Sequence, residues 1–140
     1  MKIIIALALA LAAAPTAPAA TAEGFQVIVN AANPVSTVPK DLLGRMFLKK
    51  VQKWENGQAV AAVDQDQASA ARAAFSKVVL GKPVSAVASY WQQQIFAGRD
   101  VPPAEKNGDA AVVAYVKANP GAVGYVSGNA PADVKVVTVE

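Results

Sequence analysis

The chain has 140 residues, of which 54% are hydrophobic, and its 13 lysines and arginines outnumber its 10 aspartates and glutamates. It contains no cysteine and no histidine, which excludes disulfides, thiolate or imidazole metal sites and the Ser-His and Cys-His relays of many hydrolases. No nucleophile has an evident base beside it, so we expect a protein that is not an enzyme and that uses no cofactor.

Residues 1–22 have the pattern of a secretory signal peptide. A short basic start, Met1-Lys2, precedes an uninterrupted apolar run over residues 3–14, and Ala20-Thr21-Ala22 is a small-x-small cleavage pattern. A membrane-spanning helix would need about 20 apolar residues, more than this run provides. We therefore expect cleavage before Glu23, a periplasmic protein that does not span the membrane, and one domain over residues 23–140.

The first half of this domain alternates strands and a short helix. Residues 25–29 form an apolar run that predicts a buried strand. Ser36 or Thr37 can cap a following amphipathic helix over residues 39–48. A brief extended piece and an Asn-Gly turn then lead to a second apolar strand at residues 60–63.

The second half is mostly helical and ends in two strands. Apolar residues recur at helical spacing over residues 68–79, and Gly81 ends that helix. Pro83 opens a third helix whose apolar face runs from Val84 through Trp91 to Phe96. The sequence then predicts a loop over residues 99–108, a helix over 109–119, and strands over 122–126 and 134–139.

This order of strands and helical crossovers predicts the α/β class, with a largely buried sheet. The apolar positions predict a core. Its members are Val27, Val29, Leu43, Phe47, Val63, Phe75, Val79, Trp91, Val113, Val123 and Tyr125.

The excess of positive charge lies in residues 40–55, which hold five basic and two acidic side chains. This segment could meet an anionic ligand, a membrane surface or an acidic partner, and a solvated helix end and turn explains it equally well. Aromatic residues are not interleaved with the basic ones, so we expect no nucleic-acid partner.

The junction between the second strand and the next helix offers polar groups suited to a small anion. Ser69 can donate its hydroxyl, Gln65 and Gln67 their amides, and Arg72 can reach back with its guanidinium. The unpaired N–H groups of a helix start favour the same ligand.

The junction also permits a plain capped helix start. Asp64 or Asp66 could cap the helix and occupy those N–H groups. Further along, Asp100 and Glu105 are interpreted as solvated or capping carboxylates, and Tyr125 as a core residue. The sequence alone therefore does not decide between an anion site and a capped helix start at this junction.

Three segments together resemble the phosphate-type periplasmic substrate-binding proteins of ABC transporters. Residues 43–54 are similar to a leucine, phenylalanine-leucine, glycine-lysine, tryptophan stretch of that family. Residues 60–75 occupy the place of its phosphate loop, and residues 107–109 with 119–126 resemble its closing glycine turn and Pro-Gly-Ala-Ile-Gly-Tyr-Val strand. Order and spacing agree from about residue 27 to residue 126.

The resemblance implies a periplasmic-binding-protein-like α/β lobe with a mixed, mostly parallel sheet flanked by helices. It covers only one lobe of a two-lobed clamshell. By resemblance, the chain is an exported solute-binding protein that presents phosphate or another oxyanion to an ABC permease or another periplasmic protein.

The phosphate loop itself departs from the family pattern Arg-x-Asp-Gly-Ser-Gly-Thr. Aligned on Phe75, Gln65 stands in place of the arginine, Gln67 in place of the aspartate, and only Ser69 matches; Arg72 could substitute for the lost arginine. The alternative function is a single-lobe interaction module that binds no solute and docks a periplasmic partner.

Overall fold

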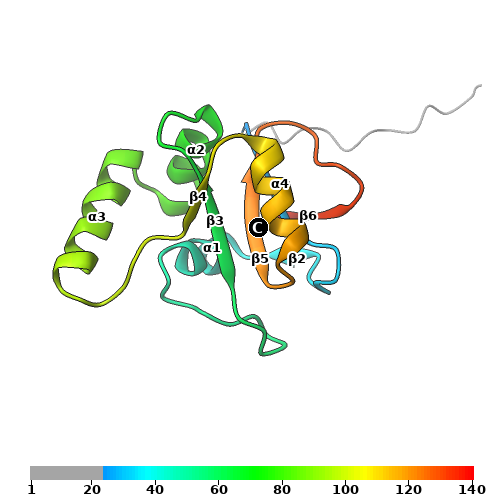
Figure 1. Ribbon diagram of the computed structural model, residues 1–140, viewed down its shortest axis with the longest axis horizontal. Helices are drawn as coiled ribbons and strands as arrows, with labels where there is room; N and C mark the ends of the chain where they lie inside the picture. Colours follow the sequence, from blue (N-terminus) through cyan, green and yellow to red (C-terminus); the bar gives the residue numbers. More distant parts are fainter. Residues whose placement is uncertain (1–23) are drawn as a thin grey trace, which may run out of the picture.

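The computed structural model describes residues 24–140, so the expected signal peptide and its cleavage site lie outside the described residues. The described part is a six-stranded sheet with helices on both faces (Figure 1). The elements, in chain order, are β1 (Gln26–Asn30), β2 (Thr37–Val38), α1 (Lys40–Phe47), β3 (Ala61–Gln65), α2 (Ala70–Phe75), the π-helix η1 (Ser76–Leu80), α3 (Val84–Phe96), β4 (Ala104–Lys106), α4 (Asp109–Ala118), β5 (Ala122–Val126) and β6 (Val134–Val139).

The strand order is β2-β6-β1-β5-β3-β4. β1 runs antiparallel to both of its neighbours, β5 and β6, whereas the other three adjacent pairs are parallel. The sheet is therefore mixed and mostly parallel, as the resemblance implies.

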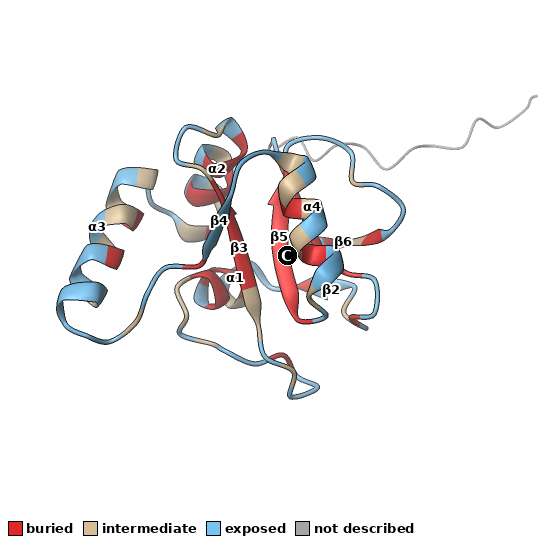
Figure 2. Cartoon of the chain, in the orientation of Figure 1, coloured by how far each residue is buried: buried red, intermediate tan, exposed pale blue. Residues whose placement is uncertain are grey.

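Two cores lie on opposite faces of the sheet because side chains alternate along each strand. Val27 and Val29 of β1 point into a large core that they share with α1, α2 and η1. Ile28 points into a smaller core under α4. Between these layers β5 is buried along its whole length and β3 from Ala62 onward (Figure 2).

Aromatic side chains fill the centre of the large core. Phe75 stacks on Tyr125 with ring centroids 4.2 Å apart, and it also contacts Phe25 and Phe47 at 5.5 and 4.6 Å. All members of the predicted core are buried except Val113.

Val113 is only partly buried, and its neighbours Val112 and Val116 face the sheet instead. Helix α4 packs directly over Gly124 of β5, where an added Cβ would lie 2.6 Å from Val63 and 2.9 Å from Val112. The close approach of helix and sheet, which the absent side chain permits, decides which face of α4 is buried.

Two short strands lie at positions where the sequence predicts a helix cap and a loop. Thr37 does not cap α1; it lies in β2, which pairs in parallel with β6, and α1 begins after Pro39 without a side-chain cap. β4 lies within the predicted loop over residues 99–108 and pairs in parallel with β3. In both cases hydrogen bonds to a strand distant in sequence override the local pattern.

Helix α3 stands apart from the sheet, beyond α2 (Figure 1). Val87 and Trp91 are buried, but Ile95 is 53% and Phe96 is 92% exposed, so the predicted apolar face continues into solvent. Within residues 24–140, none of the helices combines the length and apolar character needed to cross a membrane.

Candidate functional site

The carboxyl ends of the parallel strands β3, β4 and β5 meet at one edge of the sheet. Open α/β sheets place their ligands at this edge. Polar side chains from all three strands and from the helices that follow them gather there, and we refer to them as the polar cluster. Its members are Asp64, Gln65, Ser69, Arg72, Glu105, Asp109, Tyr125 and Ser127.

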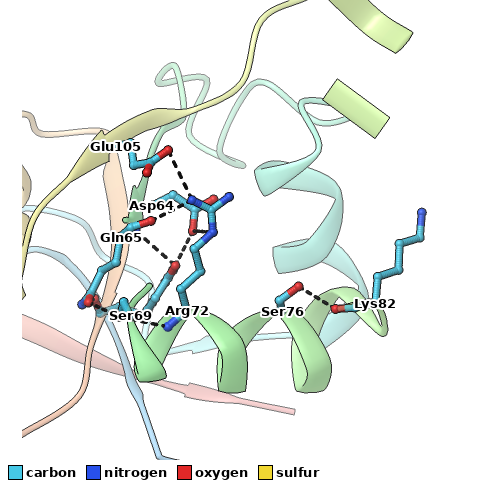
Figure 3. Close-up of polar contacts among 8 residues, drawn as sticks. Asp64, Gln65, Ser69, Arg72, Ser76, Lys82 and Glu105 are labelled. Carbon is cyan, nitrogen blue, oxygen red and sulfur yellow. Dashed lines mark hydrogen bonds and ion pairs between the residues drawn. The ribbon is translucent and has the colours of Figure 1, made fainter. Parts of the chain in front are cut away.

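Arg72 of α2 lies at the centre of the polar cluster and is only 6% exposed. Its Nη1 donates to the Gln65 carbonyl at 2.8 Å and lies 3.3 Å from a Glu105 oxygen, while its Nε lies 3.8 Å from Asp64 (Figure 3). Nη2 has no hydrogen bond or ion pair to a described residue. The guanidinium is thus held on one side and keeps one terminal nitrogen unengaged.

Ser69 is the N-cap of α2. Its Oγ accepts a hydrogen bond from the Arg72 backbone N–H at 3.2 Å and donates to Gln65 Oε1 at 2.6 Å. The helix start is therefore capped, as one interpretation of the sequence held, but by Ser69 and by neither Asp64 nor Asp66.

Gln65 connects β3 to the neighbouring elements. Its Nε2 donates to Asp109 Oδ1 at 2.9 Å and to the Tyr125 carbonyl at 3.0 Å. Because Gln65 Oε1 accepts a hydrogen bond from the Ser69 hydroxyl, both ends of the amide are hydrogen-bonded within the protein. Gln67, in contrast, is exposed, and its side chain makes no hydrogen bond to the described part of the chain, so the structure does not bring it into the polar cluster.

Asp64 and Tyr125 form a buried pair in which the Tyr125 hydroxyl donates to Asp64 Oδ1. Burial raises the pKa of Asp64, although the Arg72 charge and the Tyr125 hydrogen bond oppose the rise. Burial and the adjacent Asp64 charge raise the pKa of Tyr125 as well, so its hydroxyl stays protonated at neutral pH.

Asp109 begins α4 and binds the loop after β5. Its carboxylate accepts hydrogen bonds from the Ser127 N–H and hydroxyl at 3.0 and 2.7 Å, and from the Gly128 N–H at 3.3 Å. Partial burial raises the pKa of Asp109, but these hydrogen bonds and the one from Gln65 outweigh it and hold the pKa below its usual value.

The polar cluster can bind and orient a ligand, and its chemistry is that of hydrogen bonds and charge. The structure brings together three of the four predicted site residues: Gln65, Ser69 and Arg72. Sequence reasoning did not assign Glu105, Asp109 or Tyr125 to the site. The Asn-Gly-Asp turn that contains Asp109 was a usable signal, whereas Glu105 gave none because it lies in a segment predicted as loop.

No family model and no curated protein matches the sequence. Solved structures do match the fold. A protein assigned as a phosphate ABC transporter substrate-binding protein from Clostridium perfringens, solved with bound phosphate, superposes with a TM-score of 0.67 at 21% identity over 83% of this chain and 44% of that one. An ABC-type phosphate transport receptor from Vibrio cholerae gives 0.64 at 23% identity over 83% and 46% of the two chains.

A protein assigned as a phosphate binding protein from Planctomyces limnophilus gives 0.63 at 22% identity over 84% of this chain and 41% of that one. The chain thus spans less than half the length of the structures it resembles. At these identities the likeness establishes the fold: the chain adopts a single periplasmic-binding-protein-like α/β lobe.

Proposed function

We propose that the chain is an exported, one-lobe binding protein that recognises a small oxyanion, with phosphate as the first candidate. In this proposal the polar cluster binds the anion, and the protein presents it to an ABC permease or another periplasmic partner. The likeness of the fold to phosphate-binding proteins supports the ligand class. The observation that carries the proposal is the guanidinium of Arg72, held at the carboxyl edge of the sheet with Nη2 unengaged.

Glu105 is the group that an incoming anion would replace. Its carboxylate offers the guanidinium an oxygen acceptor at 3.3 Å, as an oxyanion would, and its side chain is 46% exposed on the edge strand β4. The contacts of Arg72 to Asp64 and to the Gln65 carbonyl come from inside the fold and can persist. Guanidinium groups bind oxyanions through two parallel N–H donors, and Nη1 and Nη2 together provide such a pair.

The other three predicted site residues have different roles in this proposal. Ser69 holds the backbone of Arg72, and its hydroxyl can turn from Gln65 to the anion. Gln65 positions the cluster rather than the ligand, because both ends of its amide are engaged. Gln67 lies exposed on the loop before α2, where its amide is available as a donor.

Calorimetric titration of the purified protein with phosphate and sulfate tests the proposal. We expect saturable binding, and we expect Arg72→Lys to weaken it tenfold or more, because a hydrogen bond to a charged partner contributes about 1.5–3 kcal/mol and lysine cannot form the two-donor contact. Arg45→Lys is the matched control, since Arg45 pairs with Asp41 on the exposed face of α1. Equal affinities for the parent and Arg72→Lys would show that the anion binds elsewhere.

One observation favours the alternative, an interaction module without solute binding. Ile95, Phe96 and Val101 are exposed large apolar side chains near the end of α3, and such patches mark interaction surfaces. Absence of saturable binding by both the parent and Glu105→Gln, in which the competing carboxylate is removed, would support this alternative. A measurement of solution mass would then show whether the chain associates with itself.

A further inference from the structure

A hollow of about 500 Å³ lies between the segment that follows β1, helix α1 and the turn at residues 53–56. We refer to it as the apolar groove. Its lining includes Asn33, Val38, Leu42, Met46, Lys53, Trp54 and Glu55. Sites for small molecules have volumes of about 300–1,000 Å³, and none of these residues belongs to the polar cluster.

The floor of the apolar groove is suited to an apolar body. Val38, Met46 and Trp54 are buried in the large core and reach the groove from below, and Leu42 packs against them. The indole N–H of Trp54 already donates to the Gly121 carbonyl at 2.9 Å. The tryptophan therefore offers the groove its apolar ring and no unpaired donor.

Asn33 supplies a polar group that the fold leaves unpaired. It is 3% exposed, its N–H donates to Asn30, its Oδ1 accepts from the Val35 N–H at 3.0 Å, and its carbonyl accepts from Lys135 Nζ at 3.3 Å. Its Nδ2 has no hydrogen-bond partner, and within residues 24–140 it is the one buried side-chain nitrogen or oxygen in this condition. Buried donors are normally paired, so the group that Asn33 lacks is an acceptor.

The rim of the groove carries a lysine that is suited to an anionic acceptor. Lys53 and Glu55 lie on the rim, both exposed, and neither forms an ion pair with the described residues. An anionic head placed beside Lys53 would be attracted by its ammonium, whereas the Glu55 carboxylate would repel it.

We propose that the apolar groove binds a small amphiphilic carboxylate. Its hydrocarbon body lies over Val38, Leu42 and Trp54, and its carboxylate accepts from Asn33 Nδ2 and is attracted by Lys53. This site is independent of the oxyanion site at the polar cluster, and phosphate does not compete for it.

Titration with sodium decanoate tests the proposal. The Trp91→Phe background leaves Trp54 as the reporter of binding by fluorescence, and the Asn33 side-chain amide is followed in ¹H–¹⁵N spectra. We expect saturable binding that shifts the Asn33 Nδ2–H resonances, and weaker binding of decanol and decylamine. Addition of phosphate should leave the titration unchanged.

Variants of the exposed rim residues test whether positive charge on the rim strengthens decanoate binding. Lys53→Gln should weaken decanoate binding severalfold, Glu55→Gln should tighten it, and Lys50→Gln, an exposed lysine outside the groove, should leave it unchanged. Asn33→Asp keeps the acceptor for the Val35 N–H but removes the donor, so binding should be lost. If that variant does not fold, the two rim variants decide the question alone.

Several results would overturn the proposal. Absence of saturable binding in both the parent and Glu55→Gln would show that the groove takes no carboxylate. Binding of decanol or decylamine as tight as that of decanoate would show that the head group is not the recognised feature. Decanoate affinity unchanged in folded Asn33→Asp would show that the buried amide has no part in the site.

Discussion

Removal of the Glu105 carboxylate should strengthen anion binding while it slightly weakens the fold. In the free protein Glu105 lies 3.3 Å from Arg72 Nη1, so a bound oxyanion has to displace it. Glu105→Gln keeps the size of the side chain and removes the competing charge. The variant therefore changes the free energy of the unliganded state and leaves the donors of Arg72 in place.

The size of the effect follows from the exposure of the pair. Two unit charges about 4 Å apart interact by about 1 kcal/mol in water and about 4 kcal/mol near a protein surface. Because the Glu105 side chain is 46% exposed, solvent screening and side-chain entropy reduce the net contribution to about 1 kcal/mol. At 1.4 kcal/mol per factor of ten, the affinity for phosphate should rise about fivefold.

The two consequences have opposite signs, which makes the prediction specific. Calorimetry should show the tighter binding, and urea denaturation should show an unfolding free energy lower by about 1 kcal/mol or less. Asp41→Asn is the control, because it also removes one carboxylate from an arginine, in the exposed Asp41–Arg45 pair. If both variants changed the phosphate affinity equally, or if Glu105→Gln left it unchanged, Glu105 would not be the group that the anion replaces.

Phe75→Ala should cost about 3–5 kcal/mol, since it empties the centre of the aromatic core, and a melting curve equal to that of the parent would contradict the described packing. Gly124→Ala should lower the melting temperature because its methyl group enters the contact of α4 with the sheet, whereas Gly128→Ala, with only ordinary contacts, should change it little. Folding lowers the pKa of Asp109, so its carboxylate stabilises the fold above its unfolded pKa of about 3.9, and this contribution is lost as pH falls through the folded pKa. Asp109→Asn should therefore make the unfolding free energy depend less on pH in the acid range. Mass spectrometry of the secreted fraction should show a chain that begins at Glu23, and an intact Met1 would contradict the signal peptide.

The elements that depend on local pattern follow from the sequence. The apolar run of β1 and the helical spacing through Phe75 predict both the class of element and the buried face. In α3 the spacing predicts the burial of Trp91 but not the exposure of Phe96. Such patterns are informative because burial of apolar surface is the dominant favourable term in folding. The same local reasoning places Ser69 and Arg72 one turn apart at a helix start, where the structure has them.

Contacts between residues that lie far apart in the sequence are set by the tertiary structure. β2 and β4 are too short to be predicted, and each is stabilised by hydrogen bonds to one long strand beside it. The same holds for the site: Glu105 and Asp109 reach Arg72 and Gln65 only because β3, β4 and β5 end at one edge. The charge of a side chain follows from the residue type, but whether another group neutralises that charge depends on distances that only the folded chain sets.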